Sequence, residues 1–195
     1  SSIENTLKSE NIILYDKWNN KIIDLVKKSI SLVSPSFKYL NDTMNINDYI
    51  KIKILPYKDT SLSRVIDGYA MQKNVCSKKM RTNIENPSIL IINGGLDCGS
   101  ASVNNFDKFF IQEPVYVEQM RKKIELIDVD IIIVNKNIVQ NLQDQLIKKK
   151  NISMILNVKQ SSLKKIARCN KTKVLDDIDN INPNVHIGHC KQFKI

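Results

Sequence analysis

Ile131-Ile-Ile-Val-Asn-Lys-Asn-Ile138 opens the stretch of sequence that decides the fold. Its first four residues are a continuous apolar run of strand length, which is typical of a strand buried on both faces of a sheet. Residues 138–149 then place apolar side chains at helical spacing, and residues 153–157 are again short and apolar. Strand, helix and strand in this order predict two parallel strands joined by a right-handed crossover.

The same alternation extends in both directions along the chain. Upstream, residues 88–92 form a short apolar run, and Pro114 is expected to open a helix because proline suits the first helical turn. Downstream, Ser161-Ser162 are expected to cap a helix, and residues 173–175 to form a fourth strand. The sequence therefore predicts an α/β fold with a parallel, βα-repeating part. Its helices are expected to bury Val117, Met120, Ile124, Ile127, Leu142, Leu146, Ile147, Leu163, Ile166 and Ala167.

The first part of the chain has a different pattern. Residues 15–33 carry one apolar stripe at helical spacing, which predicts a lead-in helix. Residues 48–55 alternate isoleucine with tyrosine and lysine, which predicts a half-buried strand. Asp67-Gly68 is a hairpin-type turn signal, so residues 69–73 are expected to return as a strand. An antiparallel β part is thus expected before the parallel part.

We expect the chain to have three parts. Residues 1–42 are a flexible N-terminus with the lead-in helix, residues 43–185 are one α/β domain, and residues 186–195 are a C-terminal return segment. No linker rich in Gly, Ser or Pro separates the antiparallel part from the βα part, so both are assigned to the same domain.

The charge of the chain limits the classes of partner. Lys and Arg number 30 against 20 Asp and Glu, which gives a net charge of +10. This excess suits an anionic partner, either nucleic acid or an acidic membrane surface, but dispersed lysines in a chain rich in Ile, Asn and Lys also fit compositional drift. Because aromatic residues are only 6% of the chain, nucleic acid is not expected as a partner. The densest cluster, residues 148–150, is expected at a helix end, where its lysines complement the helix dipole.

Targeting signals and cysteine usage predict a cytoplasmic chain. The first residues do not have the basic and apolar regions of a signal peptide, and no apolar run reaches the roughly 18 residues that span a bilayer. The four cysteines, at positions 76, 98, 169 and 190, are far apart and form no C-x-x-C motif. Free thiols in a reducing compartment are therefore expected.

No motif in the sequence predicts catalysis. Residues 93–100 follow a strand as a phosphate-binding loop does, but they have neither Gly-Lys-Ser/Thr nor the G-x-G-x-x-G spacing. His186, His189 and Cys190 are soft metal ligands, but a closed zinc site needs four. We expect no catalytic residue, no metal site and no cofactor in this segment, and a binding role instead.

Several stretches, taken together and in order, are characteristic of one family. They include Asn157-Val-Lys159 followed by Ile166-Ala-Arg-Cys169, and the closing Ile187-Gly-His-Cys-Lys-Gln-Phe193. The others are residues 44–56, 66–80 and 86–92, and Gln112-Glu113 with Tyr116. This set resembles the chaperonin-like region of PIKfyve-type phosphatidylinositol 3-phosphate 5-kinases. Much of it is also similar to the apical domain of group II chaperonins.

The resemblance implies a fold and a role. The fold would be a chaperonin apical-type domain with β/β/α layers, preceded by a helical segment like the chaperonin intermediate domain. The role would be a non-catalytic scaffolding module of a lipid kinase, which holds protein partners at endosomal or vacuolar membranes while the kinase domain lies elsewhere. An anionic membrane surface is a possible further partner. The alternative is the apical domain of a chaperonin subunit, which binds unfolded protein through an exposed apolar groove.

The resemblance also implies where partners bind. Carried over by position, the binding segments are the loop over residues 74–80 and the outer face of the helix that follows Lys159. For the lysines among them, a plain solvated surface is an equally weighted interpretation. Residues 97–110 are too few for the helical protrusion that closes a chaperonin cage, so no lid is expected. The implied partner-binding residues are Asn74, Ser77, Lys78, Lys79, Met80, Gln160, Lys164, Lys165 and Arg168.

Overall fold

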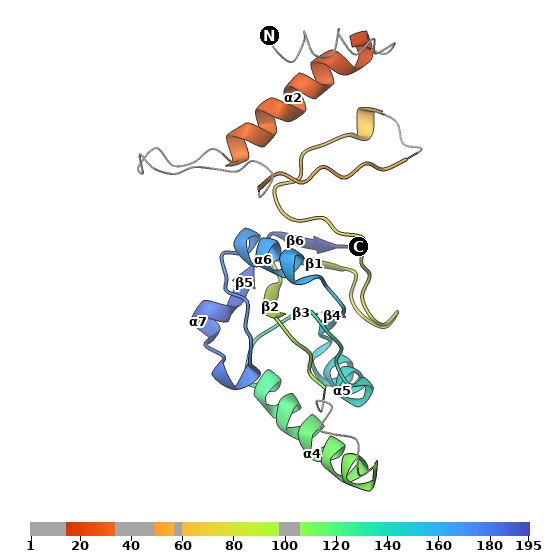
Figure 1. The fold of residues 1–195 in the computed structure, drawn as a ribbon, viewed down its shortest axis with the longest axis vertical. Coiled ribbons are helices and arrows are strands. Elements are labelled where there is room, and N and C mark those ends of the chain that lie inside the picture. The colour runs from red at the N-terminus through yellow and green to blue at the C-terminus, as the bar shows by residue number, and fades with distance from the viewer. Residues whose placement is uncertain (1–14, 34–48, 57–59, 98–105) are drawn as a thin grey trace. The chain divides into compact units, whose positions relative to one another are not determined.

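The structure is a computed structural model that describes residues 15–33, 49–56, 60–97 and 106–195 (Figure 1). The chain divides into two compact units, Ser1–Asp67 and Gly68–Ile195. The three-part division expected from the sequence stays a prediction.

The long helix in the described part of the first unit is α2 (Tyr15–Val33), which confirms the predicted lead-in helix. A short 3₁₀ helix, η1 (Thr60–Leu62), follows later in the unit. The ammonium group of Lys21 donates a hydrogen bond to the carbonyl oxygen of Ser61 over 3.4 Å, and this contact joins α2 to η1.

The strand expected over residues 48–55 is wrong for the part that the structure describes. Residues 50–55 belong to no strand, and the side chains of Ile52 and Ile54 are 82% and 86% exposed. Alternation of isoleucine with lysine indicates one apolar face. A strand also needs a neighbouring strand that forms hydrogen bonds with its backbone N–H and C=O groups. No described strand pairs with this segment.

The hairpin expected around Asp67-Gly68 is also wrong. Gly68 has a φ of +149°, which side chains rarely allow, so the chain does turn there, but residues 69–73 form no strand. Tyr69 and Met71 instead pack their side chains against a core cluster of the second unit. Side-chain burial, and not backbone pairing, fixes this segment.

A four-stranded sheet forms the centre of the second unit, in the order β4-β3-β2-β5. The parallel pairs β2–β3 and β3–β4 confirm the predicted βα repeat. β5 pairs with β2 in the antiparallel sense, so the C-terminal return segment supplies one edge of the sheet. The strands are β2 (Ser88–Ile92), β3 (Ile131–Val134), β4 (Ser153–Ile155) and β5 (Ile187–His189).

The fourth parallel strand expected at residues 173–175 is wrong. Leu175 makes a single parallel bridge to Ile92, with its N–H donating to Ile91 over 2.8 Å. The position beside the rest of β2 is taken by β5, which leaves no room for a longer pairing.

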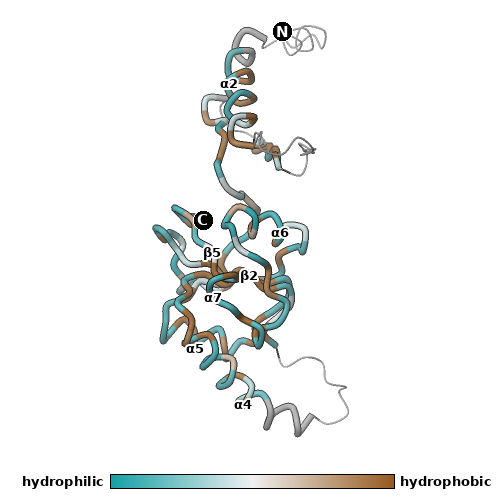
Figure 2. Tube along the Cα trace, turned by 90° about the vertical axis from the view of Figure 1, so that its left-hand side faces the viewer, coloured by the Kyte–Doolittle hydropathy of each residue, from teal (hydrophilic) through white to brown (hydrophobic). Residues whose placement is uncertain are grey.

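Two layers cover the sheet, one on each face (Figures 1 and 2). Leu90 and Ile92 of β2 face one core cluster together with α4 and α5, whereas Ile89 and Ile91 face a second cluster together with α6. This alternation follows from the pleat of the strand, which sends successive side chains to opposite faces. The covering elements are α4 (Phe106–Glu125), α5 (Gln140–Lys150), α6 (Gln160–Cys169), and the antiparallel pair of β1 (Asn83–Glu85) with β6 (Gln192–Lys194).

The helix faces predicted from periodicity are confirmed. Every expected position is buried except Ile147, which is partly buried. Short helices η2 (Ile178–Asn180) and α7 (Pro183–His186) complete the unit, with Asp177 and Asn182 as their capping residues.

Two helix boundaries differ from expectation. α4 begins at Phe106, so Pro114 lies inside the helix and not at its start. Proline removes one backbone hydrogen bond, and the exposed side of a helix that is held by its buried face tolerates this loss. α6 has Lys159 at its N-cap, and a lysine side chain has no acceptor for a backbone N–H. The capping expected from Ser161-Ser162 is therefore wrong: both lie inside the helix, where the hydroxyl of Ser162 accepts a hydrogen bond from Tyr69 over 2.8 Å.

The packing of α5 on the sheet predicts a large difference between two leucines. Leu142 is fully buried, so Leu142→Ala should lower the free energy of unfolding by about 2–5 kcal/mol, since it leaves a cavity. Leu126→Ala makes the same change at a side chain that is 88% exposed, and should cost less than about 0.5 kcal/mol. Urea denaturation of both variants checks this, and similar losses would contradict the described core.

Candidate partner-binding surface

The loop over residues 74–80 is fixed against the open edge of β4. The N–H of Cys76 donates to the carbonyl oxygen of Met154 over 3.0 Å, and the N–H of Met154 donates to the thioether sulfur of Met80 over 3.2 Å. An uncovered edge strand exposes backbone groups that invite pairing with other chains. The loop therefore covers the sheet edge, and the edge in turn holds the loop in place.

The side chains of this loop divide into anchors and exposed groups. Met80 is only 4% exposed and lies in the α4–α5 core cluster, and Val75 packs against the same cluster. The side chains of Asn74, Lys78 and Lys79 are exposed, and that of Ser77 is half-buried. Met80 therefore acts here as an anchor, and the lysines are the groups that face solvent.

The thiol of Cys76 is held by a hydrogen bond. Its Sγ donates to the side-chain oxygen of Gln143 over 3.0 Å. Burial, with a smaller contribution from the carboxylate of Asp144, raises the pKa of the Cys76 thiol above its ordinary value. A raised thiol pKa lowers reactivity, which fits a positioning role.

An ion pair at Arg81 ends the loop. The guanidinium group donates to Asp130 over 2.8 Å and to the carbonyl oxygen of Asn151 over 3.1 Å. Asp130 also accepts from the N–H and the hydroxyl of Ser88, over 3.1 and 3.0 Å. Burial by itself raises the pKa of the Asp130 carboxyl, but the hydrogen bonds from Arg81 and Ser88 outweigh it and lower the pKa. The loop is thus tied to the starts of β2 and β3.

The outer face of α6 is the second predicted segment. Leu163, Ile166 and Ala167 are buried on the sheet, so the opposite side of the helix points to solvent. Gln160, Lys164 and Arg168 recur every four residues and are exposed, and Lys165 beside them is half-buried. The period predicted the buried residues of this helix, whereas the role of its outward residues in binding stays a prediction.

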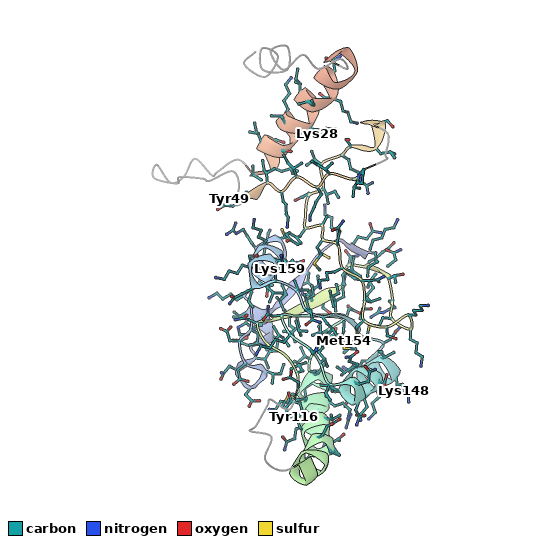
Figure 3. All side chains as sticks on the ribbon, turned by 45° about the vertical axis from the view of Figure 1, so that its right-hand side comes forward. Lys28, Tyr49, Tyr116, Lys148, Met154 and Lys159 are labelled. Carbon is teal, nitrogen blue, oxygen red and sulfur yellow. The ribbon has the colours of Figure 1, made fainter. Side chains whose placement is uncertain are left out.

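The two predicted segments lie at different sides of the sheet. The 74–80 loop lies along the β4 edge and contacts the α4–α5 side through Val75, Met80 and the bond of Cys76 to Gln143, whereas α6 covers the other face. In Figure 3, Lys148 of α5 and Lys159 of α6 lie on opposite sides of Met154. No large apolar side chain of α6 or of residues 69–81 is exposed. The exposed apolar groove expected for a chaperonin subunit is therefore not found in these described segments.

The polar loops after the strands hold one another. Asn93 donates to Asp176 over 2.8 Å, and Asn157 donates to Asn137 over 3.1 Å. A Cβ at Gly95 would lie 2.6 Å from the carbonyl oxygen of Asn137, so this position requires glycine. The phosphate-loop candidate at 93–100 is thus, up to residue 97, a packed turn; its remaining residues lie outside the described chain.

His186 and Cys190 of the candidate metal motif serve local structure. His186 accepts a hydrogen bond from the N–H of Asn182 over 3.0 Å, and Cys190 donates to the carbonyl oxygen of Gln192 over 3.4 Å. Burial raises the pKa of the Cys190 thiol. Within the described residues, no three His, Cys, Asp or Glu side chains lie together as a metal site. Cys98 is outside these residues.

One ion-pair network, centred on the buried Arg121, was not predicted from the sequence. Arg121 is 8% exposed and pairs with Glu118 and Glu125 on α4. The hydrogen bonds from Arg121 lower the pKa of Glu118 to about 2. These ion pairs could have been predicted from the sequence, because residues three and four apart share a helix face. Glu125 also pairs with Lys149 of α5, so the lysines at the end of α5 partly serve to join two helices.

The central sheet, its covering helices and the two exposed segments define an α/β module of the chaperonin apical type. Comparison with known proteins agrees with this class. Residues 2–195 match the TCP-1/cpn60 chaperonin family, so the chain belongs to that family. The open-state monomer of a group II chaperonin from Methanococcoides burtonii has a similar structure, with a TM-score of 0.69, 20% identity, and coverage of 97% of this chain and 44% of that one. This likeness confirms the predicted fold class.

Lipid kinases are among the relatives, which confirms the resemblance found in the sequence. The 1-phosphatidylinositol-3-phosphate 5-kinase FAB1A of Arabidopsis thaliana is 30% identical over 91% of this chain. The mouse 1-phosphatidylinositol 3-phosphate 5-kinase is 27% identical over 94%. T-complex protein 1 subunit gamma of Thalassiosira weissflogii is 28% identical over 92% of this chain and 36% of its own length. The chain spans only about a tenth of the length of the two kinases.

The hydrogen bonds of Asp130 predict a pH-dependent contribution to stability. Because its pKa is lowered in the folded state, its contribution is present above the unfolded pKa near 4 and is lost as the pH falls through the folded pKa. Asp130→Asn should lower the free energy of unfolding by about 1–2 kcal/mol at pH 7.

Urea denaturation from pH 7 down to about pH 3 measures this effect. The difference between the natural chain and Asp130→Asn should shrink below about pH 4. Asp128→Asn makes the same change at an exposed side chain and should cost less than about 0.5 kcal/mol. A difference for Asp130→Asn that is constant over this pH range would contradict the described role of its carboxylate.

Proposed function

We propose that this chain is a non-catalytic protein-binding and scaffolding module of a phosphatidylinositol 3-phosphate 5-kinase. In this proposal it holds regulatory protein partners, and the parent protein is peripheral to endosomal or vacuolar membranes. The kinase domain lies elsewhere in the parent, and this segment needs no cofactor. None of the helices that the structure describes could cross a bilayer.

The observation that carries the proposal is that the sheet and its covering helices hold two polar segments exposed to solvent. The loop over residues 74–80 is anchored by Cys76, Met80 and Arg81, so its lysines are held at a fixed position. The outward face of α6 is equally fixed, because its inner face is buried on the sheet. Rigid elements with exposed polar groups are suited to recognising a folded partner with little loss of conformational entropy.

The pattern of similarity supports the same proposal. Lipid kinases from plants and mouse resemble the chain over nearly its whole length, while the matched part is about a tenth of each kinase. The chain therefore corresponds to one module of such proteins. Its own activity in a parent kinase would be binding and positioning.

A second candidate is the substrate-binding domain of a chaperonin subunit. It is favoured by the fold of the group II chaperonin monomer and by the similarity to T-complex protein 1 subunit gamma. Binding of unfolded protein calls for exposed apolar surface. In the described parts of α6 and residues 69–81 the large apolar side chains are covered, which favours the scaffolding role.

The parent protein decides between the two candidates. An antibody to this chain should precipitate, from a membrane fraction of native cells, a polypeptide several times longer than 195 residues. The precipitate should phosphorylate phosphatidylinositol 3-phosphate at the 5-position, measured with labelled ATP and lipid vesicles. Recovery of a short polypeptide in a ring-sized particle, without lipid kinase activity, would overturn the proposal and support the chaperonin subunit.

A further inference from the structure

We propose that the outer surface of α6, with the turn that follows it, binds an acidic peptide segment of a partner protein. This inference rests on the proposed function and names the chemistry of the partner. The residues that carry it are called the α6 basic surface below. They are Lys159, Lys164, Lys165, Arg168, Lys171 and Lys173.

The α6 basic surface has an unusual balance of charge. Residues 157–175 contain these six cationic side chains and no Asp or Glu, although the whole chain has 20 acidic residues. This one stretch thus contributes six positive charges to a chain whose net charge is +10. The excess is concentrated in α6 and in the residues directly before and after it.

The second unit forms several ion pairs away from this stretch: Arg81 pairs with Asp130, Lys123 with Asp179, and Lys149 with Glu125. Among the described residues, no ion pair joins a carboxylate to the lysines of the α6 basic surface, at positions 159, 164, 165, 171 and 173. Their charges are therefore available to a partner.

The charges do not serve the helix itself. Lys159 occupies the N-cap, and the first turn of α6 has no acidic residue, although the positive end of the helix dipole favours anions there. Lys164 and Arg168 are four residues apart, a spacing at which like charges repel. Carboxylates from a second chain would relieve both effects.

The spacing of the cations fits a peptide. Residues four apart on a helix are about 6 Å apart along its axis, so Lys164 and Arg168 match carboxylates at that repeat. Alternate residues of an extended chain, or residues four apart on a second helix, repeat at about 6–7 Å. An acidic segment in either conformation therefore meets several cations at once.

A membrane surface is the less favoured occupant. Helices that lie in a bilayer interface insert an apolar face beside their basic residues. The apolar residues of α6, Leu163, Ile166 and Ala167, are instead buried against the sheet. With no large apolar side chain exposed on α6, the surface offers charge alone.

The test compares two variants with matched changes in charge. Lys164→Gln, Lys165→Gln and Lys171→Gln together remove three charges from the α6 basic surface. Lys148→Gln, Lys149→Gln and Lys150→Gln remove three from the end of α5, on the opposite side of the sheet (Figure 3). The probe is a fluorescein-labelled peptide of alternating Glu and Ala, about a dozen residues long, with a Gln-Ala peptide as the uncharged control.

Fluorescence anisotropy at low salt measures binding to the whole chain. The α6 variant should bind the Glu-Ala peptide about tenfold more weakly, because three exposed charge pairs at a few tenths of a kcal/mol each are lost. The α5 variant should bind within about twofold of the natural chain, and added salt should weaken binding in each case. The melting temperature of the α6 variant should be unchanged or raised, whereas a structural role for these lysines predicts a lower one.

Three outcomes would overturn the inference. One is an equal loss of binding in both variants, which would mean that net charge alone attracts the peptide. A second is no binding of the Glu-Ala peptide by the natural chain. The third is binding to phosphatidylcholine–phosphatidylserine vesicles that needs the three α6 lysines while the peptide stays unbound, which would assign the surface to a membrane. Lipid kinase activity in the antibody precipitate is a separate measurement, so this inference can fail while the proposed function stands.

Discussion

The parallel pairing of β2 with β3, buried on both faces, is the constraint on which the rest of the second unit depends. Ile89 pairs with Ile131 and Ile92 with Val134, and all four are nearly inaccessible to water. Because neither face of these strands can meet solvent, each needs a covering layer. α4 and α5 supply one layer, and α6 with the β1–β6 pair supplies the other.

The open edge of the same sheet explains the loop that the family resemblance marks as a binding segment. β4 is the last strand, and its outer backbone groups at Met154 are satisfied by Cys76 and by the sulfur of Met80. The exposed lysines at 78 and 79 are thus placed by a contact that protects the sheet. On the opposite face, burial of one side of α6 sets the direction of its basic side. Packing and recognition use opposite sides of the same elements.

Much of this arrangement was predictable because its signals are local. The runs at 88–92 and 131–134 are apolar without interruption, and the helices keep their period, so strand, helix and buried face followed directly. The inward positions of α6, Leu163, Ile166 and Ala167, followed from the same period.

The features that could not be predicted depend on partners distant in sequence. Alternation at residues 48–55 shows which side chains are apolar but does not supply a neighbouring strand. β5 reaches β2 from about a hundred residues away, and it displaces the strand expected at 173–175. Met80 was expected to face a partner, but the place of its sulfur beside Met154 is set by the sheet edge. Pro114 was expected at the start of α4, but the helix begins eight residues earlier at Phe106, so the rule for proline in the first turn placed the boundary too late.

The central claim is that the sheet edge holds the 74–80 loop as a fixed element. Amide hydrogen exchange, resolved by residue in the whole chain, tests it directly. The account predicts that the amide of Cys76, which is bonded to Met154, exchanges as slowly as the amides of β4, while the amide of the exposed Lys78 exchanges fast. If the Cys76 amide exchanges as fast as that of Lys78, the loop is not held by the edge and the account is wrong.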